Sequence, residues 1–594
     1  MALWGIEEEV KHYFADELEK EVEMTGAQFI VKFLEQKGVS HVYGIPGAAI
    51  LPFYDAVLER EHIRSINVRH EQTAIFMADG YARSTGKVGI CAATSGPGAT
   101  NFLTGLYSAY GDSVPLIAFT GQVPTNLIGK DAFQEAPIVE MARPVTKGSY
   151  LVTKTTDLPE VMSEAWKLAT QGRKGPVLID IPVNVQKGLL KINLEDYLRE
   201  EASEHDGLVK VTDSELEQVF TMIEEAEKPV LMVGGGVALG SATEELIELA
   251  LLLQIPVVSS LMGKDGFPNY HRLYAGMVGT MCQTPLGNKT LLESDLIVNL
   301  GGRFDNRSTG EMNVFKKGRK IIHINIDEKE LSRHVPTELA IVADVKDFIH
   351  KLNDFIRSRE YKPNIKALER IESLQIERTR LARQTDFESN VLKPQQAIVE
   401  VRKGLRPDAI VTLDCGLSQI WATQLYEAHE PRTFLITGRA GTMGWGLGAA
   451  MGAQLANPQR QVVNLLGDAS LGMSLQELAT AAKHNIPVVV VVLNNSLFGL
   501  IRQQQNLFFN RRWISTELDY ANHIQGHLRG LDFVAAAKGM GVEAELVEKP
   551  EQITDALTRA FSAYRPYLIE ILVDPEAQCS VSMDGTISGV REVS

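Results

Sequence analysis

The sequence predicts an α/β protein made of three doubly wound domains with parallel sheets. Apolar strands are followed repeatedly by Gly-rich turns and helical patterns, an alternation typical of doubly wound sheets. The strands are rich in Val, Ile and Leu and do not alternate with polar residues, as expected for parallel strands buried on both faces. Four such segments are VGICAATSGPG at 88–98, PVLMVGGG at 229–236, DLIVNLGGR at 295–303 and QVVNLLGD at 461–468.

Two polar stretches divide the chain into its domains. A chain of 594 residues is too long for one core, since a domain usually has roughly 100–200 residues. One stretch is acidic, at 193–207, and the other is charged with a helical pattern, from about 357 to 390. The third domain resembles the first in size and in strand–helix rhythm. The predicted parts are an extension at 1–23, forming a surface helix, domains at 24–190, 207–355 and 390–575, and a tail at 576–594.

Composition excludes several classes of protein. The hydrophobic share of 44% and the charged share of 23% are those of an ordinary globular chain, without an apolar run of the ~20 residues that span a bilayer. The net charge of −16 argues against nucleic acid or an anionic membrane as partner. The N-terminus lacks the pattern of a signal peptide. Four separated cysteines without a CxxC pair favour a reducing cytoplasm over disulfides or structural zinc.

Polar residues end two strands of the third domain. Asp468 follows VVNLLG and Asn495 follows PVVVVVLN, 27 residues later, so both lie at the carboxyl edge of a parallel sheet, where ligands bind. Asp468, Asn495 and the backbone carbonyl of Leu497 offer the hard oxygens that Mg²⁺ needs to hold a diphosphate. A helix beginning near Ser470 favours phosphate at the same place. The alternative is that Asp468 only caps that helix and Asn495 lies in a turn.

The motif GDAS…LNN resembles the diphosphate motif of thiamine-diphosphate enzymes, with Ala469 where most members have a second glycine. The resemblance covers about residues 24–585 and is closest to acetolactate synthases (acetohydroxyacid synthases) and glyoxylate carboligases. It implies a pyrimidine-binding, a central FAD-type and a diphosphate-binding domain, in that order. It also implies that Gly467, Ala469 and Ser470 line the diphosphate.

The first domain carries the matching motif, NVRHEQTAIFMADGYAR at 67–83. The resemblance implies that Glu71 meets N1′ of the aminopyrimidine and shifts this ring toward the imino form. The imine then removes the C2 proton of the thiazolium. The alternative is that Glu71 is only an acidic residue at a helix N-terminus.

Further site residues are implied by the same resemblance. GIPGAAI at 44–50 and TSGPGATN at 94–101 resemble the turns of the cofactor pocket, which include Ala48 and Gly96. In TGRAGTMGWG at 437–446, Gly441 would meet the amino group and Met443 would bend the cofactor. The segment DAFQEAPIVEMARPVTK at 131–147 would bring three side chains over the reaction space, namely Phe133, Gln134 and Lys147.

The middle domain resembles the region where these two families hold FAD, expected here as a structural cofactor. The motif VGGGV at 233–237 is a weak signal, strengthened by NLGGRFDNRSTG at 299–310. The implied FAD-binding residues are Gly235, Gly302, Arg303, Asp327 and Asp344. Arg307 would reach the mouth of the active site. The alternative is a nucleotide fold that holds no ligand.

Two reactions with one mechanism remain after these assignments. Glu71, GPGAT and the DAFQEA loop agree with acetolactate synthase, which joins two pyruvates and releases CO₂. Segments such as GLSQI at 416–420 and the insertion at 517–530 are closer to glyoxylate carboligase. In GLIRQQQ, Gln504 replaces a tryptophan with which biosynthetic synthases favour 2-oxobutanoate. Because residues at the cofactor decide the reaction class, we expect an acetolactate-synthase-like carboligase acting on small 2-oxo acids.

Two other classes are weaker alternatives. A flavin or nicotinamide oxidoreductase also uses Gly-rich turns, but no GxGxxG opens a strand–helix unit near the start. A silent homologue acting as a binding subunit is disfavoured by the intact Glu71, Asp468 and Asn495. The resemblance implies a homodimer or homotetramer, and the sequence leaves a regulatory subunit open.

Overall fold

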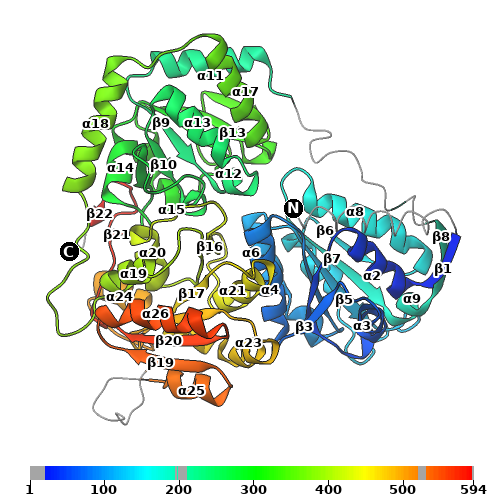
Figure 1. Cartoon of the computed structure of the whole chain (residues 1–594). Helices are drawn as coiled ribbons and strands as arrows, with labels where there is room; N and C mark the ends of the chain where they lie inside the picture. Colours follow the sequence, from blue (N-terminus) through cyan, green and yellow to red (C-terminus); the bar gives the residue numbers. More distant parts are fainter. Residues whose placement is uncertain (1–20, 194–196, 198–209, 519–529, 592–594) are drawn as a thin grey trace. The chain divides into compact units, whose positions relative to one another are not determined.

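The computed structural model describes residues 21–193, 197, 210–518 and 530–591. The chain divides into two compact units, Met1–Ala82 with Lys87–Asp206 and Arg83–Gly86 with Gly207–Ser594. The first unit holds one large parallel sheet and the second holds two. Figure 1 follows these sheets along the sequence from blue to red. The prediction of three doubly wound parallel-sheet domains is therefore confirmed.

The sheet of the first unit is parallel throughout. In spatial order its strands are β3 (Arg64–Asn67), β2 (His41–Ile45), β4 (Gly89–Ala93), β5 (Leu116–Gln122), β7 (Pro176–Pro182) and β6 (Gly148–Leu151). Helices α2 (Gly26–Gln36), α3 (Leu51–Leu58) and α8 (Leu158–Thr170) pack on one face. Helices α4 (Glu71–Thr85) and α6 (Leu103–Asp112) lie on the opposite face of this sheet. Every residue of β4, β5 and β7 is buried, which explains their unbroken apolar patterns.

The start of the described chain differs from the sequence prediction. Residues Glu21–Thr25 form strand β1, which pairs antiparallel with β8 (Leu189–Asn193). The surface helix expected over 1–23 is therefore wrong at residues 21–23, because pairing with a distant segment outweighs local helical preference. The rest of that helix, and nearly all of the acidic linker at 193–207, lie outside the described residues.

The middle sheet belongs to the second unit and is also parallel. In spatial order its strands are β11 (Tyr274–Met277), β10 (Val257–Ser259), β9 (Pro229–Val233), β12 (Leu296–Leu300), β13 (Lys320–Asn325) and β14 (Leu339–Val342). Counted along the chain this order is 3-2-1-4-5-6, the order of dinucleotide-binding doubly wound folds. One face is covered by α11 (Asp213–Glu225), α13 (Thr243–Leu253) and α17 (Val345–Ser358).

The third sheet has the same relative strand order as the first. Its parallel strands are β16 (Phe434–Ile436), β15 (Ile410–Leu413), β17 (Val462–Gly467), β18 (Val489–Asn494), β20 (Tyr567–Leu572) and β19 (Glu543–Val547). Both sheets run 2-1-3-4-6-5, which accounts for the similar strand–helix rhythm of the two domains. Helices α19 (Pro394–Lys403), α20 (Leu417–Leu425) and α26 (Glu551–Ala563) cover one face of the third sheet.

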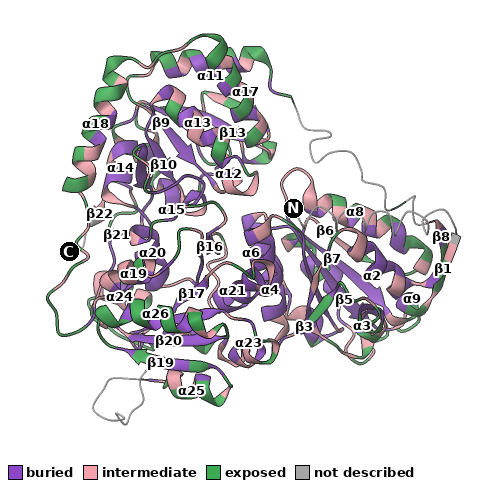
Figure 2. Cartoon of the chain, viewed as in Figure 1, coloured by how far each residue is buried: buried purple, intermediate pink, exposed green. Residues whose placement is uncertain are grey.

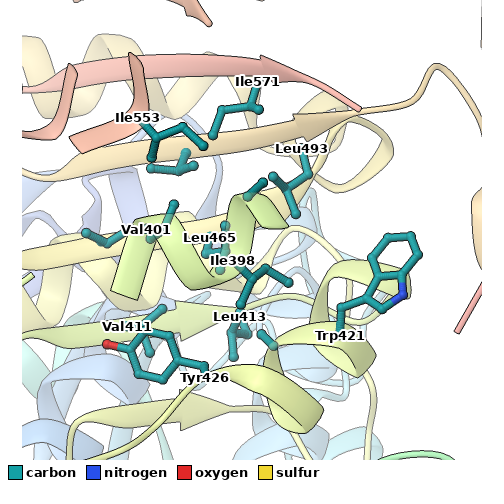
Figure 3. Close-up of a cluster of buried hydrophobic side chains, with 14 of the residues drawn as sticks. Ile398, Val401, Val411, Leu413, Trp421, Tyr426, Leu465, Leu493, Ile553 and Ile571 are labelled. Atoms are coloured by element: carbon teal, nitrogen blue, oxygen red, sulfur yellow. The ribbon is translucent and has the colours of Figure 1, made fainter. Parts of the chain in front are cut away.

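A large apolar cluster holds these helices to the third sheet. Figure 3 shows Ile398 and Val401 of α19 beside Val411 and Leu413 of β15, while Ile553 of α26 lies by Ile571. In all three sheets the central strands are largely buried, whereas edge strands such as β3 and β19 and many helix residues face solvent in part (Figure 2). The charged stretch from about 357 to 390 contains α18 (Ile365–Arg380), as its helical pattern predicts. Within the described ranges, no helix is both long and apolar enough to cross a membrane.

Candidate active site

The first sheet changes winding direction between β2 and β4, and the turns that follow these two strands meet. The backbone N–H of Ala49 donates to Thr94 Oγ1 at 3.3 Å. A methyl group on Gly47 would lie 2.6 Å from the Cβ atom of Thr94, so only glycine fits there. Parallel sheets bind ligands at such switch points. The structure thus brings the turns that contain Ala48 and Gly96 to one edge.

Glu71 lies at the same edge, as the first residue of α4, which follows β3. The side-chain amide of Asn101 donates to Glu71 Oε2 at 2.8 Å. A methyl group on Gly98 would lie 3.5 Å from Glu71 Oε1, so this oxygen faces the TSGPGATN turn. Asn101 is the last residue of that motif, and the sequence analysis predicted no role for it. A polar amide in a turn already assigned to the cofactor pocket could have indicated one.

The loop 123–137 carries Phe133 and Gln134. Phe133 is 88% exposed, so nothing within its own unit buries the ring. Gln134 has a left-handed backbone, with φ of 60°, and its Cβ would lie 2.9 Å from a methyl group on Gly96. Because Gly96 has no side chain, Gln134 approaches the pocket turn closely. Both predicted residues thus belong to a loop that lies against the edge formed by Glu71 and its neighbours.

Lys147 is not brought to this edge. It precedes β6, and its backbone N–H donates to Pro176, the first residue of β7, at 2.8 Å. This contact lies at the amino end of the strands, whereas the pocket turns follow their carboxyl ends. The ammonium group of Lys147 donates to the Gln171 carbonyl at 2.9 Å. Its assignment to the reaction space therefore stays a prediction, without support from the geometry of this unit.

In the third sheet, Asp468 and Asn495 follow the neighbouring strands β17 and β18. Helix α22 (Asp468–Gly472) begins two residues earlier than expected, at Asp468 itself. Burial raises the pKa of the Asp468 carboxyl to about 7, while backbone N–H groups of Ala469, Ser496 and Asn495 lower it. Since those N–H groups come from both strand ends, Asp468 faces the turn that contains Asn495.

The turn after β18 fixes the Asn495 side chain. The N–H of Leu497 donates to Asn495 Oδ1 at 3.1 Å, and Ser496 has a left-handed backbone with φ of 54°. A methyl group on Gly499 would lie 2.8 Å from Asn495 Nδ2. The three proposed metal-binding residues thus lie on two adjacent strand ends. Within the described ranges, no group of three His, Cys, Asp or Glu is arranged to bind a metal, so a metal here would need neutral oxygens in addition to the Asp468 carboxylate.

The switch point of the third sheet lies between β15 and β17. Asp414, at the end of β15, accepts the backbone N–H of Gly446 at 2.6 Å and so caps α21 (Trp445–Ala456). Burial raises the pKa of Asp414 to about 7. Met443, partly buried, comes just before this helix, and a methyl group on Gly441 would lie 3.5 Å from Cys415 Sγ. These contacts place the Gly441–Met443 segment beside the strand end that leads to Cys415.

Ser418 was missed by sequence reasoning. It is buried in the first turn of α20, and methyl groups on Gly416 or Gly467 would each lie 3.9 Å from its hydroxyl oxygen. The Ser418 hydroxyl therefore faces the β17–α22 turn, which contains Gly467, Ala469 and Ser470. The serine hydroxyl two residues after Gly416, close to the end of β15, could have indicated a role at the site. The sequence analysis used its segment, GLSQI at 416–420, only to compare the two families.

The glycine turns of the middle domain pack against each other. A methyl group on Gly234 would lie 2.2 Å from Gly302 Cα, and one on Gly236 would lie 2.8 Å from Gly301 Cα. The neighbouring Gly235 begins α12 (Gly235–Leu239), and Gly302 is followed by Arg303, at the switch point between β9 and β12. Part of this glycine pattern thus serves close packing of the two turns, whether or not a nucleotide binds.

The remaining predicted residues of this domain have local roles. Asp344 caps α17, accepting the N–H groups of Lys346 and Asp347, and Asp327 accepts the N–H of Lys329. Both follow adjacent strands, β13 and β14, at their carboxyl ends. Arg307 lies in the short helix α15 (Asn306–Thr309), and its guanidinium approaches Cys282 Sγ at 3.8 Å.

Family models match all three domains in order. They are the thiamine pyrophosphate enzyme N-terminal TPP binding domain at residues 24–141, the central domain at 216–352 and the C-terminal TPP binding domain at 414–571. A solved structure, the Rhodococcus jostii RHA1 thiamine diphosphate-dependent 4-hydroxybenzoylformate decarboxylase, matches with a TM-score of 0.79 and 26% identity, over 93% of this chain and 99% of that one. The fold and these matches define a thiamine-pyrophosphate enzyme.

Curated relatives narrow this class. The chain is 38% identical to a probable acetolactate synthase large subunit of Methanocaldococcus jannaschii, over 96% of this chain and 95% of the relative. It is 40% identical to the acetolactate synthase large subunit of Corynebacterium glutamicum, over 93% and 88%. It is 39% identical to the chloroplastic acetolactate synthase of Arabidopsis thaliana, over 92% and 81%. The chain belongs to the acetolactate synthase family, which confirms the resemblance found in the sequence. The predicted domain boundaries and site residues stay predictions.

Proposed function

We propose that this protein decarboxylates a 2-oxo acid and joins the resulting fragment to a second 2-oxo acid, making acetolactate and CO₂ from two pyruvates. The observation that carries the proposal is the pocket turn of the first unit. There Glu71, the acid on which this chemistry depends, has an amide partner and one oxygen directed at the cofactor-pocket motif. Family membership supports the same reaction.

The diphosphate and a Mg²⁺ ion fit the third sheet. Asp468 supplies a buried carboxylate beside Asn495, and Mg²⁺ prefers such oxygens. At the same strand end, Gly467 leaves room for the diphosphate because it has no side chain, and Ser418 supplies a hydroxyl. When bound, thiamine diphosphate supplies the electron sink for decarboxylation. In the proposal Glu71 holds a proton at N1′, Met443 supports the ring, and Asp468, Asn495 and the Leu497 carbonyl hold the metal.

We also propose FAD in the middle domain, supported by its strand order and by the glycine turns at its switch point. The assigned residues are Gly235, Gly302, Arg303, Asp327 and Asp344. Carboligation needs no net redox change, so the flavin would have a structural role. The purified protein should then be yellow. A colourless protein with full turnover would mean that the middle domain is empty.

Arg307 is proposed to bind a substrate carboxylate, because its guanidinium lies near Cys282 and Cys415, the latter beside Gly441. Gln504 is exposed on α24 (Gly499–Phe508). An amide in place of an apolar wall favours a small acceptor such as pyruvate over 2-oxobutanoate. Glyoxylate remains the alternative donor.

Product analysis tests the function. Purified protein is incubated with thiamine diphosphate and Mg²⁺, and with pyruvate or glyoxylate in separate reactions. We expect acetolactate and CO₂ from pyruvate. Tartronate semialdehyde from glyoxylate, without acetolactate, would establish the glyoxylate reaction instead. No product from either substrate, despite measured cofactor binding, would favour a silent homologue. Turnover that requires an electron acceptor would favour the oxidoreductase.

We propose further that the protein works in the cytoplasm as a homodimer or homotetramer, in keeping with its four free cysteines. The relatives from M. jannaschii and C. glutamicum are named large subunits, which supports a smaller partner subunit for this chain too. Affinity purification from the native host would test this. Recovery of the chain alone, at full activity, would argue against such a partner.

A further inference from the structure

One buried amide ties the two ends of the loop 123–137 together. The structure describes this whole loop, which has neither helix nor strand. Gln122, the last residue of β5, is buried just before it. Its Nε2 donates to the carbonyl of Ala136 at 3.0 Å, and its Oε1 accepts the N–H of Val123 at 2.9 Å. The side chain that closes the loop is therefore Gln122, while Phe133 and Gln134 lie within it.

A buried carboxylate holds this amide. Asp180, on the neighbouring strand β7, is 1% exposed. Its Oδ2 accepts from Gln122 Nε2 at 2.9 Å, and its Oδ1 accepts from the Thr120 hydroxyl at 2.7 Å. Burial raises the pKa of Asp180 to about 7, whereas these two donors lower it. Because the ionised carboxylate only accepts hydrogen bonds, Gln122 must turn its NH₂ toward Asp180 and keep its oxygen for Val123.

The segment that continues from Asp180 holds two more parts of the same edge. Asn184 accepts the N–H of Thr125 at 2.9 Å and donates to the Thr125 hydroxyl at 3.1 Å. The amide of Gln186 donates to the carbonyl of Ala49, in the pocket turn, at 2.7 Å. Asp180, Asn184 and Gln186 are the three polar residues of this segment. Among them, only Asp180 binds a side chain that in turn contacts both ends of the loop, namely that of Gln122. Asp180 is also the one acidic group of the three.

We propose that Asp180 is a positioning residue that, through Gln122, fixes the loop carrying Phe133 and Gln134. The loop thereby favours joining of the decarboxylated fragment to the second substrate over its release. Both outcomes break the bond to the carboxylate carbon, release one CO₂ and consume one proton overall. In release the proton ends on the carbonyl carbon of the aldehyde, whereas in joining that carbon bonds to the carbonyl carbon of the second 2-oxo acid and the proton ends on the new hydroxyl. This inference rests on the proposed function for the product ratio, but the contacts themselves make it testable without turnover.

Two variants break the link at different points, and a third serves as control. In Asp180→Asn, the new NH₂ group must face either the Thr120 hydroxyl or Gln122 Nε2, so one hydrogen bond to position 180 is lost. Gln122→Leu removes the side-chain amide but keeps a similar volume. Thr120→Val deletes the other hydrogen bond of Asp180 but leaves the loop contacts intact. We expect both link variants to raise the aldehyde-to-acetolactate ratio at least tenfold. The ratio should stay within twofold in Thr120→Val, and thiamine diphosphate affinity within threefold in all three.

Hydrogen exchange provides a readout independent of activity. In both link variants, amides in peptides covering 123–137 should exchange at least tenfold faster, while peptides from β4 stay unchanged. The double variant should be no worse than the worse single variant, because both changes break one chain of contacts. If loop exchange and product ratio are unchanged in folded Gln122→Leu, the inference is wrong. If wild type makes no carboligation product but loop exchange responds as expected, the proposed function fails and the positioning role stands.

Discussion

The side-chain amide of Asn101 donates a 2.8 Å hydrogen bond to Oε2 of Glu71, thirty positions earlier in the chain. The bond fixes the rotation of the carboxyl group and leaves Oε1 near Gly98. A carboxyl group that transfers a proton needs one defined oxygen in contact with its partner. Asn101 thus orients the residue on which the proposed chemistry depends.

Glu71→Gln should fold and bind the cofactor but react slowly. The amide keeps the side-chain volume yet supplies no acidic proton, so activation of the pyrimidine weakens. We expect a loss of at least ~10²-fold in turnover, the scale of a general acid–base group. Exchange of the thiazolium C2 proton, followed by NMR, reports this step alone. Exchange at the wild-type rate would show that Glu71 is not the activator.

Changes at Asn101 should affect the same step by different amounts. Asn101→Ala frees the carboxyl group to rotate, and loss of one such hydrogen bond corresponds to roughly 1 kcal/mol, or about fivefold in rate. Asn101→Asp sets a second carboxylate against Glu71, so repulsion should cost more than the alanine change. The measurement is C2 proton exchange across pH in both variants. Equal rates in Asn101→Asp and wild type would contradict the orienting role.

Asp468→Ala should lose Mg²⁺-dependent binding of thiamine diphosphate. The change removes a proposed ligand of the Mg²⁺ ion, and this ion compensates the negative charge of the diphosphate. Asp532→Ala is the matched control, because Asp532 caps α25 (Phe533–Gly539) in the same domain. Loss of a cap costs about 1 kcal/mol of stability but no cofactor affinity. Calorimetric titration of both variants separates the roles. Wild-type affinity in Asp468→Ala would mean that Asp468 is only a helix cap.

Asp414 should make thermal stability depend on pH. Burial raises its folded-state pKa to about 7, above the unfolded value near 4. The folded state therefore binds the extra proton between these values, and its contribution to stability is lost as pH rises through this window. The amide introduced by Asp414→Asn cannot titrate, but its oxygen can still accept the N–H of Gly446. The unfolding temperature of wild type relative to Asp414→Asn should fall from pH 4 to 7 and level off above. A difference independent of pH would refute the shift.

Mixing two chains that are each severely impaired should restore activity if sites are shared between subunits. Glu71 lies in one compact unit and Asp468 in the other. In a heterodimer of Glu71→Gln and Asp468→Ala chains, one shared site carries both lesions and the other carries none. Activity should then return toward half of wild type per heterodimer. No recovery, with subunit exchange demonstrated by mass spectrometry, would mean that each chain forms its own site.

By itself the sequence determined the three parallel sheets and the edge on which Asp468 and Asn495 lie. Each strand is an unbroken apolar segment that ends in a turn motif, so its position and its carboxyl end can be predicted from a short stretch of sequence. Every parallel strand in a sheet also ends at the same edge. The family resemblance likewise followed from contiguous motifs, each within a short stretch of chain.

Only the tertiary structure decided which side chains meet. Asn101 with Glu71, Asp180 with Gln122, and β1 with β8 join segments that are distant in sequence. The family resemblance of segment 131–147 assigned Lys147 to the reaction space together with Phe133, yet Lys147 lies at the amino end of the strands. Periodicity reports which face of an element is apolar, but the partner of a buried polar group is set by strand order. Such a group must find its hydrogen bond wherever the fold provides one.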